Sequence, residues 1–203
     1  MYYKIYTDIR DAAWQCLIDN NIDSLPVDVL KIARQSNIDV KKNSRIKILL
    51  SDEYAKAFYN GEKWIIVYND RNDVPVSRFA IAHELGHILL GHVKTYAKYA
   101  TIEDIGIKPK AENQADTFAL RLLCPACILM ELDLHSPEEI SAFCRVPTHL
   151  AQKRSDRMKE LYKKNKFFSN NLEIEIRKNF NIYLSATKEN QRKDPVWHSS
   201  KNE

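Results

Sequence analysis

The segment His83-Glu84-Leu85-Gly86-His87 places two histidines four residues apart. On a helix, side chains at this spacing project from one face, so both imidazoles can bind a single zinc ion. Glu84 then lies beside the metal and outside its ligand set, where its carboxylate can take a proton from a water molecule that zinc activates. The pattern predicts a Zn²⁺ hydrolase site on a helix over about residues 76–91. Because three matching residues also occur by chance, a third ligand is needed to decide.

The position of the third ligand separates two kinds of zinc site. The three-histidine kind needs a glycine and a histidine where this chain has Leu90 and Val93, so it is excluded. The other kind takes a glutamate from a second helix downstream. Glu112 fits this role, and Asp116, on the same helix face, can hold a ligand histidine by its free ring N–H. The same two acids also fit the solvated face of an ordinary amphipathic helix.

Three segments carry a resemblance to a known protein family. They are residues 79–90 (FAIAHELGHILL), 112–119 (ENQADTFA) and 122–125 (LLCP). Together they resemble the ImmA/IrrE family of metallo-endopeptidases, with a similar layout over roughly residues 10–165. Family members commonly have a glutamate where this chain has Gln114, and often a methionine at Cys124. The thermolysin-like spacing nevertheless places the carried-over ligand at Glu112.

The resemblance implies a cytoplasmic zinc endopeptidase that cleaves a regulatory protein, a helix-turn-helix transcriptional repressor of a mobile genetic element. The partner is then a protein substrate, and neither a membrane nor direct nucleic-acid binding is expected. The alternative is a DNA-binding transcriptional regulator with a structural or vestigial metal site. Glu84 favours the enzyme, because a structural site has no use for a general base.

Composition and periodicity predict an α+β fold. With 44% hydrophobic residues and only four glycines in 203 residues, the chain resembles a soluble, mostly helical domain. Strands are expected over 55–59 and 64–68, joined by a turn at Asn60-Gly61, with shorter extended pieces at 38–40 and 46–50. We expect this small β-sheet or hairpin to pack beside the helix that carries the HExxH segment.

The remaining chain divides into further helices and a basic extension. Helices are predicted over 8–20, from an N-cap at Ser24 to about 35, and over 110–123, 126–132, 137–144 and 147–164. The last two resemble a helix-turn-helix, with polar donors on the second helix at Gln152, Lys153, Arg154 and Arg157. We expect a metallopeptidase domain over residues 1–165 and a partly disordered extension over 166–203, with a strand at 172–176 and disorder from about Ala186.

Charge and cysteine content bound the surroundings of the protein. The net charge of +4 is uneven, because residues 151–203 hold 13 of the 31 Lys and Arg residues and only 7 of the 27 Asp and Glu. A solvated surface is the preferred interpretation of this basic region. Four irregularly spaced cysteines, without a signal segment, fit a reducing cytoplasm. Cys124 and Cys127 form a lone CxxC, which we interpret as small buried hydrophobic residues.

Two parts of the mechanism stay open at this level. His92, Tyr96 and Tyr99 are each able to stabilise the oxyanion, and nothing in the sequence selects among them, although His92 fits a bystander at the helix end. An extended substrate can add to the edge of the 55–68 hairpin through main-chain hydrogen bonds.

Overall fold

The protein is an α+β structure in which helices predominate. The computed structural model describes residues 8–92 and 107–193. The helices in these ranges are α1 (Ile9–Asp19), α2 (Val29–Gln35), α3 (Asn43–Ile46), α4 (Val74–Leu89), α6 (Ile107–Leu123), α7 (Ala126–Glu131), α8 (Pro137–Cys144), α9 (Thr148–Lys163), α10 (Asn171–Asn179) and α11 (Asn181–Lys193). The strands are β1 (Ile38–Lys42), β2 (Ala55–Tyr59) and β3 (Trp64–Tyr68). The predicted fold class is confirmed.

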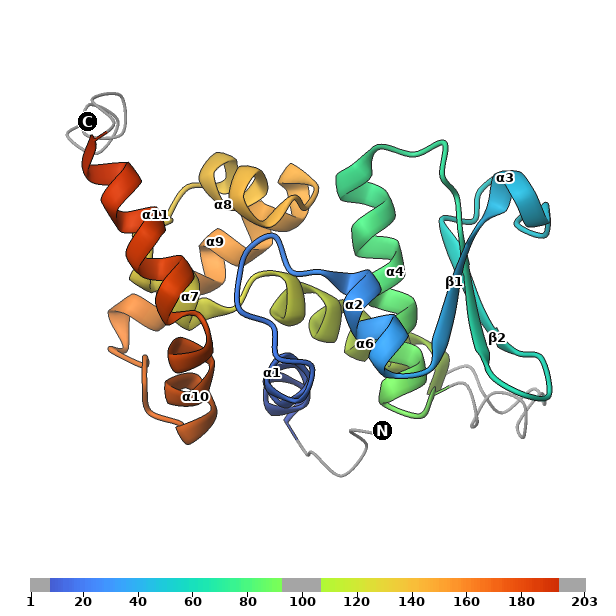
Figure 1. Ribbon diagram of the computed structural model, residues 1–203, viewed down its shortest axis with the longest axis horizontal. Helices are drawn as coiled ribbons and strands as arrows, with labels where there is room; N and C mark the ends of the chain where they lie inside the picture. The colour runs from blue at the N-terminus through green and yellow to red at the C-terminus, as the bar shows by residue number, and fades with distance from the viewer. Residues whose placement is uncertain (1–7, 93–106, 194–203) are drawn as a thin grey trace.

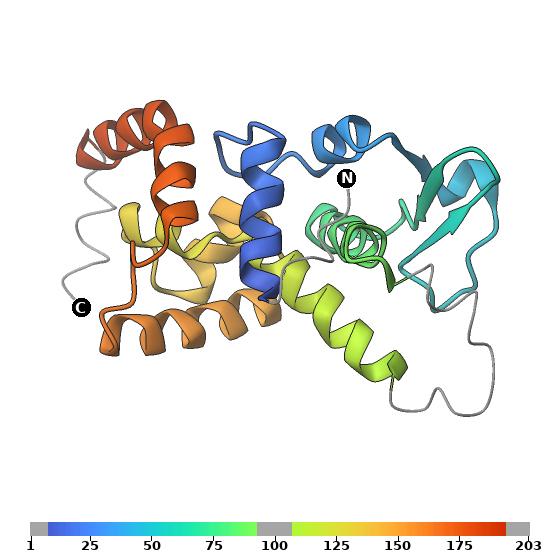
Figure 2. The same cartoon turned by 90° about the horizontal axis from the view of Figure 1, so that it is seen from below.

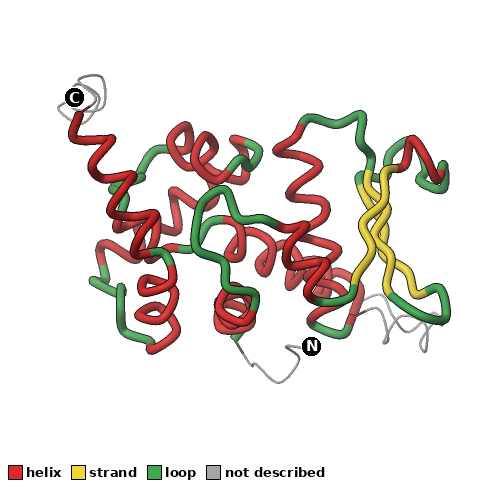
Figure 3. Tube along the Cα trace, in the orientation of Figure 1, coloured by secondary structure: helices red, strands yellow, loops and turns green. Residues whose placement is uncertain are grey.

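A three-stranded mixed sheet forms one end of the molecule (Figures 1 and 3). The strand order is β1-β3-β2, with β1 parallel and β2 antiparallel to β3. The predicted hairpin is present, and Gly61 supplies a backbone φ of +100° in its turn, a conformation that side chains disfavour. Among the described residues β2 pairs only with β3, so within them its other side is an edge of the sheet.

Helix α4 lies between the sheet and α6 and packs against both (Figure 1). Its apolar residues Leu85, Ile88 and Leu89 are buried in the main core. Helix α1 packs against α6 on the side away from the sheet (Figure 2). This layering fixes α4 and α6 side by side, which positions the metal-binding candidates that both helices carry.

The extension beyond residue 165 is helical where the sequence predicts a strand. Residues 172–176 belong to α10, whose N-cap Asn170 accepts a hydrogen bond from the backbone N–H of Leu172 (2.9 Å). The predicted strand is wrong because the apolar residues Leu172, Ile176, Phe180 and Leu184 recur every four residues, a helical spacing that the local alternation concealed. These side chains join the core.

Disorder from about residue 186 is also wrong as far as Lys193, where α11 ends. Residues 194–203 lie outside the described residues. Helix α10 packs against α1 and α7, and the boundary between residues 165 and 166 stays a prediction.

Smaller differences concern the element ends. Residues 46–50 do not form a strand: α3 ends at Ile46, and the Asn43 side chain accepts the N–H groups of Ile48 and Leu49. Asp28, and not Ser24, caps α2, because its side chain accepts from the N–H of Lys31 (2.9 Å). No helix in the described part of the chain combines the length and the apolar character that a membrane crossing needs.

Candidate metal centre

The two histidines of the HExxH segment lie on α4, and the two downstream acids lie on α6. Helix α4 begins after Asp73 with a proline in its first turn, and one face of it is buried. Four-residue spacing therefore puts His83 and His87 on the face that meets α6. Glu112 and Asp116 face them from α6 by the same rule. All four residues lie close together between α4 and α6.

Three donor atoms converge between these helices. The Nε2 atoms of His83 and His87 lie 2.9 Å apart. Oε2 of Glu112 lies 3.2 Å from Nε2 of His83 and 3.4 Å from Nε2 of His87. The three residues are the only group of this kind among the described His, Cys, Asp and Glu residues. Hereafter they are called the metal cluster.

The metal cluster fits a zinc ion in chemistry and in size. A tetrahedral zinc with ligands at roughly 2.0–2.1 Å separates its ligand atoms by about 3.3 Å, close to the three observed distances. Two imidazole nitrogens and one carboxylate oxygen also form a His₂Glu set, which leaves a fourth position free for water or substrate. Electron-pair donors this close need a cation or a shared proton between them, so the arrangement is suited to a metal.

Asp116 holds His83 from the side opposite the cluster. Its Oδ1 atom lies 2.8 Å from Nδ1 of His83. Because a carboxylate only accepts, Nδ1 of a neutral His83 carries the proton and its Nε2 lone pair faces the cluster. Burial opposes a charge on His83, but the hydrogen bond with Asp116 and the negative charges of Glu84, Asp116 and Glu112 together raise its pKa. Burial and the neighbouring His83 lower the pKa of His87 to about 4. A neutral His87 is ready to bind a metal ion.

Glu84 is a half-buried carboxyl beside the cluster. Burial raises the pKa of Glu84, while the charge of His83 and a hydrogen bond from the backbone N–H of Ala57 oppose that rise. Ala57 belongs to β2, so the sheet orients this side chain. A carboxyl whose pKa is raised towards neutrality is suited to accept and return a proton.

The metal cluster opens into a cleft of about 540 Å³. Its walls include His83, Glu84 and Glu112, the start of β2 with Tyr54 and Ala55, and the N-terminal part of α9. This volume falls within the range of about 300–1,000 Å³ that is typical of ligand sites. The cleft reaches β2 at its first residue, Ala55.

Comparison with protein families gives the class of the molecule. The model of the M78 peptidase family, described as the IrrE N-terminal-like domain, matches residues 34–156, more than half of the chain. The chain belongs to this family. The match includes the HExxH segment and the second helix that carries Glu112, so the IrrE-like domain is a metallopeptidase domain with a cluster suited to a metal. No curated protein matches the chain.

Gly86 lets the two helices of the IrrE-like domain approach closely, which sequence analysis did not anticipate. A Cβ atom at this position would lie 3.2 Å from Cδ1 of Phe118 and 3.3 Å from the backbone Cα and O of Ala115. Such contacts are tighter than normal, so a larger residue would push α4 and α6 apart. The signal was present in the sequence as a glycine inside a helix, where it otherwise costs stability.

His92 lies behind His87, and sequence analysis had not selected it. Its Nδ1 atom is 3.2 Å from Nδ1 of His87, and its Nε2 atom is 3.1 Å from Oε1 of Gln114. Both ring nitrogens thus contact neighbours on the side of His87 away from the cluster. Tyr96 and Tyr99, the other two candidates for oxyanion stabilisation, lie outside the described residues.

The α8–α9 pair contributes to the cleft. Lys153 and His149 line the cleft opposite the metal cluster, while Arg154 is only 5% exposed. Two of the four donors that the helix-turn-helix interpretation needs at a groove-facing surface therefore point elsewhere.

The cysteines behave as predicted: Cys124, Cys127 and the other two are buried free thiols, and burial raises the pKa of Cys127 to about 12.

Proposed function

We propose that the protein is a zinc-dependent endopeptidase acting on a regulatory protein. In this proposal His83, His87 and Glu112 bind zinc, and Glu84 is the catalytic base. The observation that carries it is the convergence of three donor atoms and a half-buried carboxyl in one wall of a peptide-sized cleft. Membership of a peptidase family supports the reaction class.

The chemistry divides between the metal and Glu84. When bound, zinc supplies a Lewis acid that polarises a peptide carbonyl and lowers the pKa of water towards about 7. Glu84 accepts the proton at a carboxylate oxygen as water attacks the carbonyl carbon. The same carboxyl donates that proton to the leaving amine as the C–N bond breaks. Its raised pKa supports the first step, because a weaker acid has a stronger conjugate base.

Asp116 and His92 orient the two histidine ligands. Asp116 fixes the proton of His83 on Nδ1 through the 2.8 Å contact. A matching arrangement serves His87 when its Nδ1–H donates to Nδ1 of His92 and Nε2–H of His92 donates to Gln114. Outer contacts of this kind hold ligand rings in position and increase their basicity.

An extended substrate binds along the outer edge of β2. Ala55 and Tyr54 line the cleft at this edge, and a main chain laid there gains backbone hydrogen bonds without regard to its sequence. Beyond the metal cluster, the side chains of the cleft wall that can donate to the developing oxyanion are Tyr54, His149 and Lys153.

The regulatory substrate is proposed from the family resemblance. In this account it is a helix-turn-helix repressor of a mobile genetic element, and cleavage occurs in the cytoplasm. The four free cysteines are compatible with a reducing compartment.

Cleavage of the repressor encoded beside this chain's gene tests the proposal. We expect the zinc-loaded protein to cut it at a defined position, and Glu84→Gln to keep its zinc while losing at least ~10²–10⁴-fold in rate. The exposed acid Glu138, changed to Gln, is the matched control. Equal rates for Glu84→Gln and wild type would refute the role of Glu84, and an uncut repressor would refute the substrate.

A further inference from the structure

A second polar site lies away from the metal cluster, where α1, α6, α9 and α10 meet. It is a small cavity of about 40 Å³. Its lining includes five cationic side chains, those of Arg10, Arg121, Arg154, Arg157 and Lys166. We call it the basic cavity. Its members are spread over more than 150 residues of sequence, and none of them belongs to the metal cluster or its cleft.

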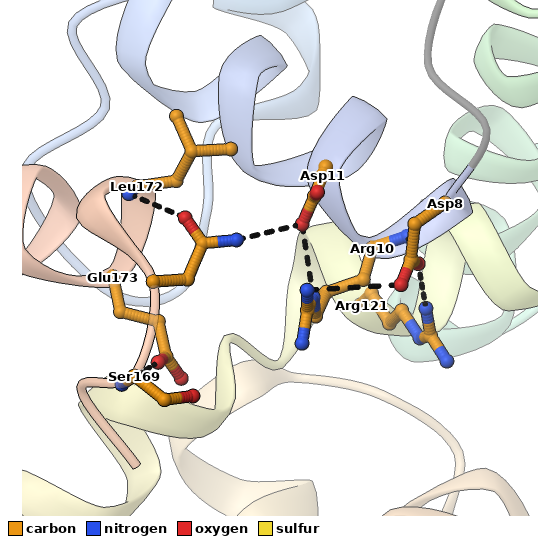
Figure 4. A network of polar contacts seen from close by, with 8 residues as sticks. Asp8, Arg10, Asp11, Arg121, Ser169, Leu172 and Glu173 are labelled. Carbon is orange, nitrogen blue, oxygen red and sulfur yellow. Dashed lines mark hydrogen bonds and ion pairs between the residues drawn. The ribbon is translucent and has the colours of Figure 1, made fainter. Parts of the chain in front are cut away.

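Two of the five cations have acidic partners. Nη1 of Arg121 lies 3.0 Å from Oδ1 of Asp8, and Nε of Arg10 lies 2.9 Å from Oδ1 of Asp11 (Figure 4). Arg10 also lies 3.7 Å from Oδ2 of Asp8. These contacts tie α1 to α6 and neutralise one side of the cavity. Within the described chain, no carboxylate forms an ion pair with the other three cations.

Arg154 is the unusual member, because it is almost fully buried and still has no counter-ion. It is 5% exposed, and its Nε–H has no hydrogen-bond partner. The indole N–H of Trp14, 2% exposed and in the same lining, also has no partner. Burial, and then the like charge of Arg121, lower the pKa of Arg154. Buried charges and donors without partners are costly, so a native structure normally supplies an ion or a water molecule for them.

The one acid in the lining offers little opposition to an anion. Glu173 is 3% exposed, and its Oε2 atom accepts the backbone N–H of Ser169 at 3.0 Å (Figure 4). Burial raises the pKa of Glu173. With Glu173, Asp8 and Asp11 all counted as ionised, the five cations still leave an excess of positive charge around the cavity.

We propose that the basic cavity binds a tetrahedral oxyanion, either free phosphate or the phosphoryl group of a nucleotide. Guanidinium forks match the oxygen geometry of such an anion, and the indole N–H adds a directed donor. A water molecule needs roughly 10–15 Å³ by the same volume measure, so the cavity holds a few waters or one small oxyanion. Arg157 and Lys166, both exposed, attract the anion at the rim.

Thermal unfolding of the full-length, metal-loaded protein tests this site. Sodium phosphate is titrated at constant ionic strength, with sodium chloride as the balancing salt. Because a ligand that binds only the folded state stabilises it, we expect a saturable rise in Tm of roughly 5 °C at 100 times Kd. Sulfate should act similarly. A phosphate curve that coincides with the chloride curve would overturn the proposal.

Variants locate the effect. Arg154→Met should abolish the saturable rise, while its Tm in chloride alone should equal or exceed that of wild type, because an unpaired buried charge is removed. Arg157→Gln and Lys166→Gln should weaken phosphate binding by roughly two- to fivefold. Lys159→Gln, an exposed cation of α9 that pairs with Asp156, should leave it unchanged.

The remaining outcomes also test the proposal or identify the anion. A saturable rise that persists in Arg154→Met would place the anion elsewhere, for example at the metal cluster, and contradict the proposal. If Arg154→Met does not fold, a phosphate Kd that is unchanged in both Arg157→Gln and Lys166→Gln would also contradict the proposal. Adenosine diphosphate distinguishes the source of the anion. If the rise in Tm saturates at a lower concentration of adenosine diphosphate than of phosphate, the ligand is a nucleotide phosphoryl group. If only phosphate and sulfate give a saturable rise, the ligand is the free anion.

Discussion

The metal cluster with its cleft and the basic cavity share two helices, and the two sites present opposite problems in electrostatics. Helix α6 carries Glu112 of the metal cluster and, two and a half turns later, Arg121 of the basic cavity. Helix α9 likewise lines the cleft with Lys153 and the cavity with Arg154. One site gathers electron-pair donors around a point, and the other gathers N–H donors. The first is therefore complementary to a cation and the second to an anion.

The two sites also differ in how their polar groups are supported. In the metal cluster, His83 and His87 each have a further partner behind them, Asp116 and His92. In the basic cavity, the side chain at the centre, Arg154, has none among the described residues. The contrast suggests that the metal cluster is held in position before its ligand binds, whereas the basic cavity gains stability when its anion arrives.

Of the three substitutions considered below, removal of the Glu112 side chain should have the largest effect, and the effect is on zinc affinity. Outer-shell partners typically contribute about 10–100-fold to metal affinity, so we expect loss of a direct ligand in Glu112→Ala to cost more than roughly 100-fold. Competition with a chromophoric chelator measures the zinc Kd. Glu160→Ala, which changes a half-exposed acid of α9, is the control. The response to phosphate should stay as in wild type, and an unchanged zinc Kd would mean that the third ligand is assigned wrongly.

Gly86→Ala should give an intermediate effect, because it alters only the spacing of the helices. The added Cβ meets the backbone of Ala115 at 3.3 Å, and backbone cannot move aside as a flexible side chain can. We expect roughly tenfold weaker zinc binding, although alanine favours a helix by about 1 kcal/mol over glycine. Chelator competition measures the effect on zinc binding, and thermal unfolding measures the effect of helix propensity on stability. Zinc affinity equal to that of wild type would show that close approach is not needed.

Glu131→Gln should give the smallest effect. It removes the counter-ion of Arg177 and Lys188, two cations that are paired where Arg154 is not. Ion pairs with Lys188 and Arg177 outweigh burial and lower the pKa of Glu131. Its contribution is therefore fully present above the unfolded pKa of about 4.3 and is lost as pH falls through the lower folded value. We expect Glu131→Gln to lose about 1 kcal/mol at pH 7. Denaturant unfolding at pH 7 and pH 3 tests this, since a difference of equal size at both would contradict it.

The metal cluster could be predicted because its residues follow a short-range rule on two helices. His83 and His87 are four residues apart, as are Glu112 and Asp116, so each pair reveals its shared face without a structure. The basic cavity follows no such rule. Its charged residues come from four helices and a loop. From the sequence, the basic charge was interpreted as solvated, because burial of Arg154 depends on tertiary packing.

The fold shows the same division between local and distant determinants. The 55–59 and 64–68 strands were predicted to the residue, since alternation and an Asn-Gly turn act locally. Residues 172–176 also alternate, yet they form a helix because Ile176 packs into the core together with Phe180 and Leu184. The partner surfaces on α1 and α7 lie too far away in sequence for local patterning to reveal them.

X-ray absorption at the zinc edge tests the central claim most directly, because it reports the ligand atoms of the bound metal. Zinc held by His83, His87 and Glu112 predicts a first shell of nitrogen and oxygen alone, at about 2.0–2.2 Å, in one zinc per chain. Glu112→Ala should change this shell while the wild-type spectrum stays free of sulfur. A zinc–sulfur distance of about 2.3 Å would place the metal on the cysteines and contradict the account.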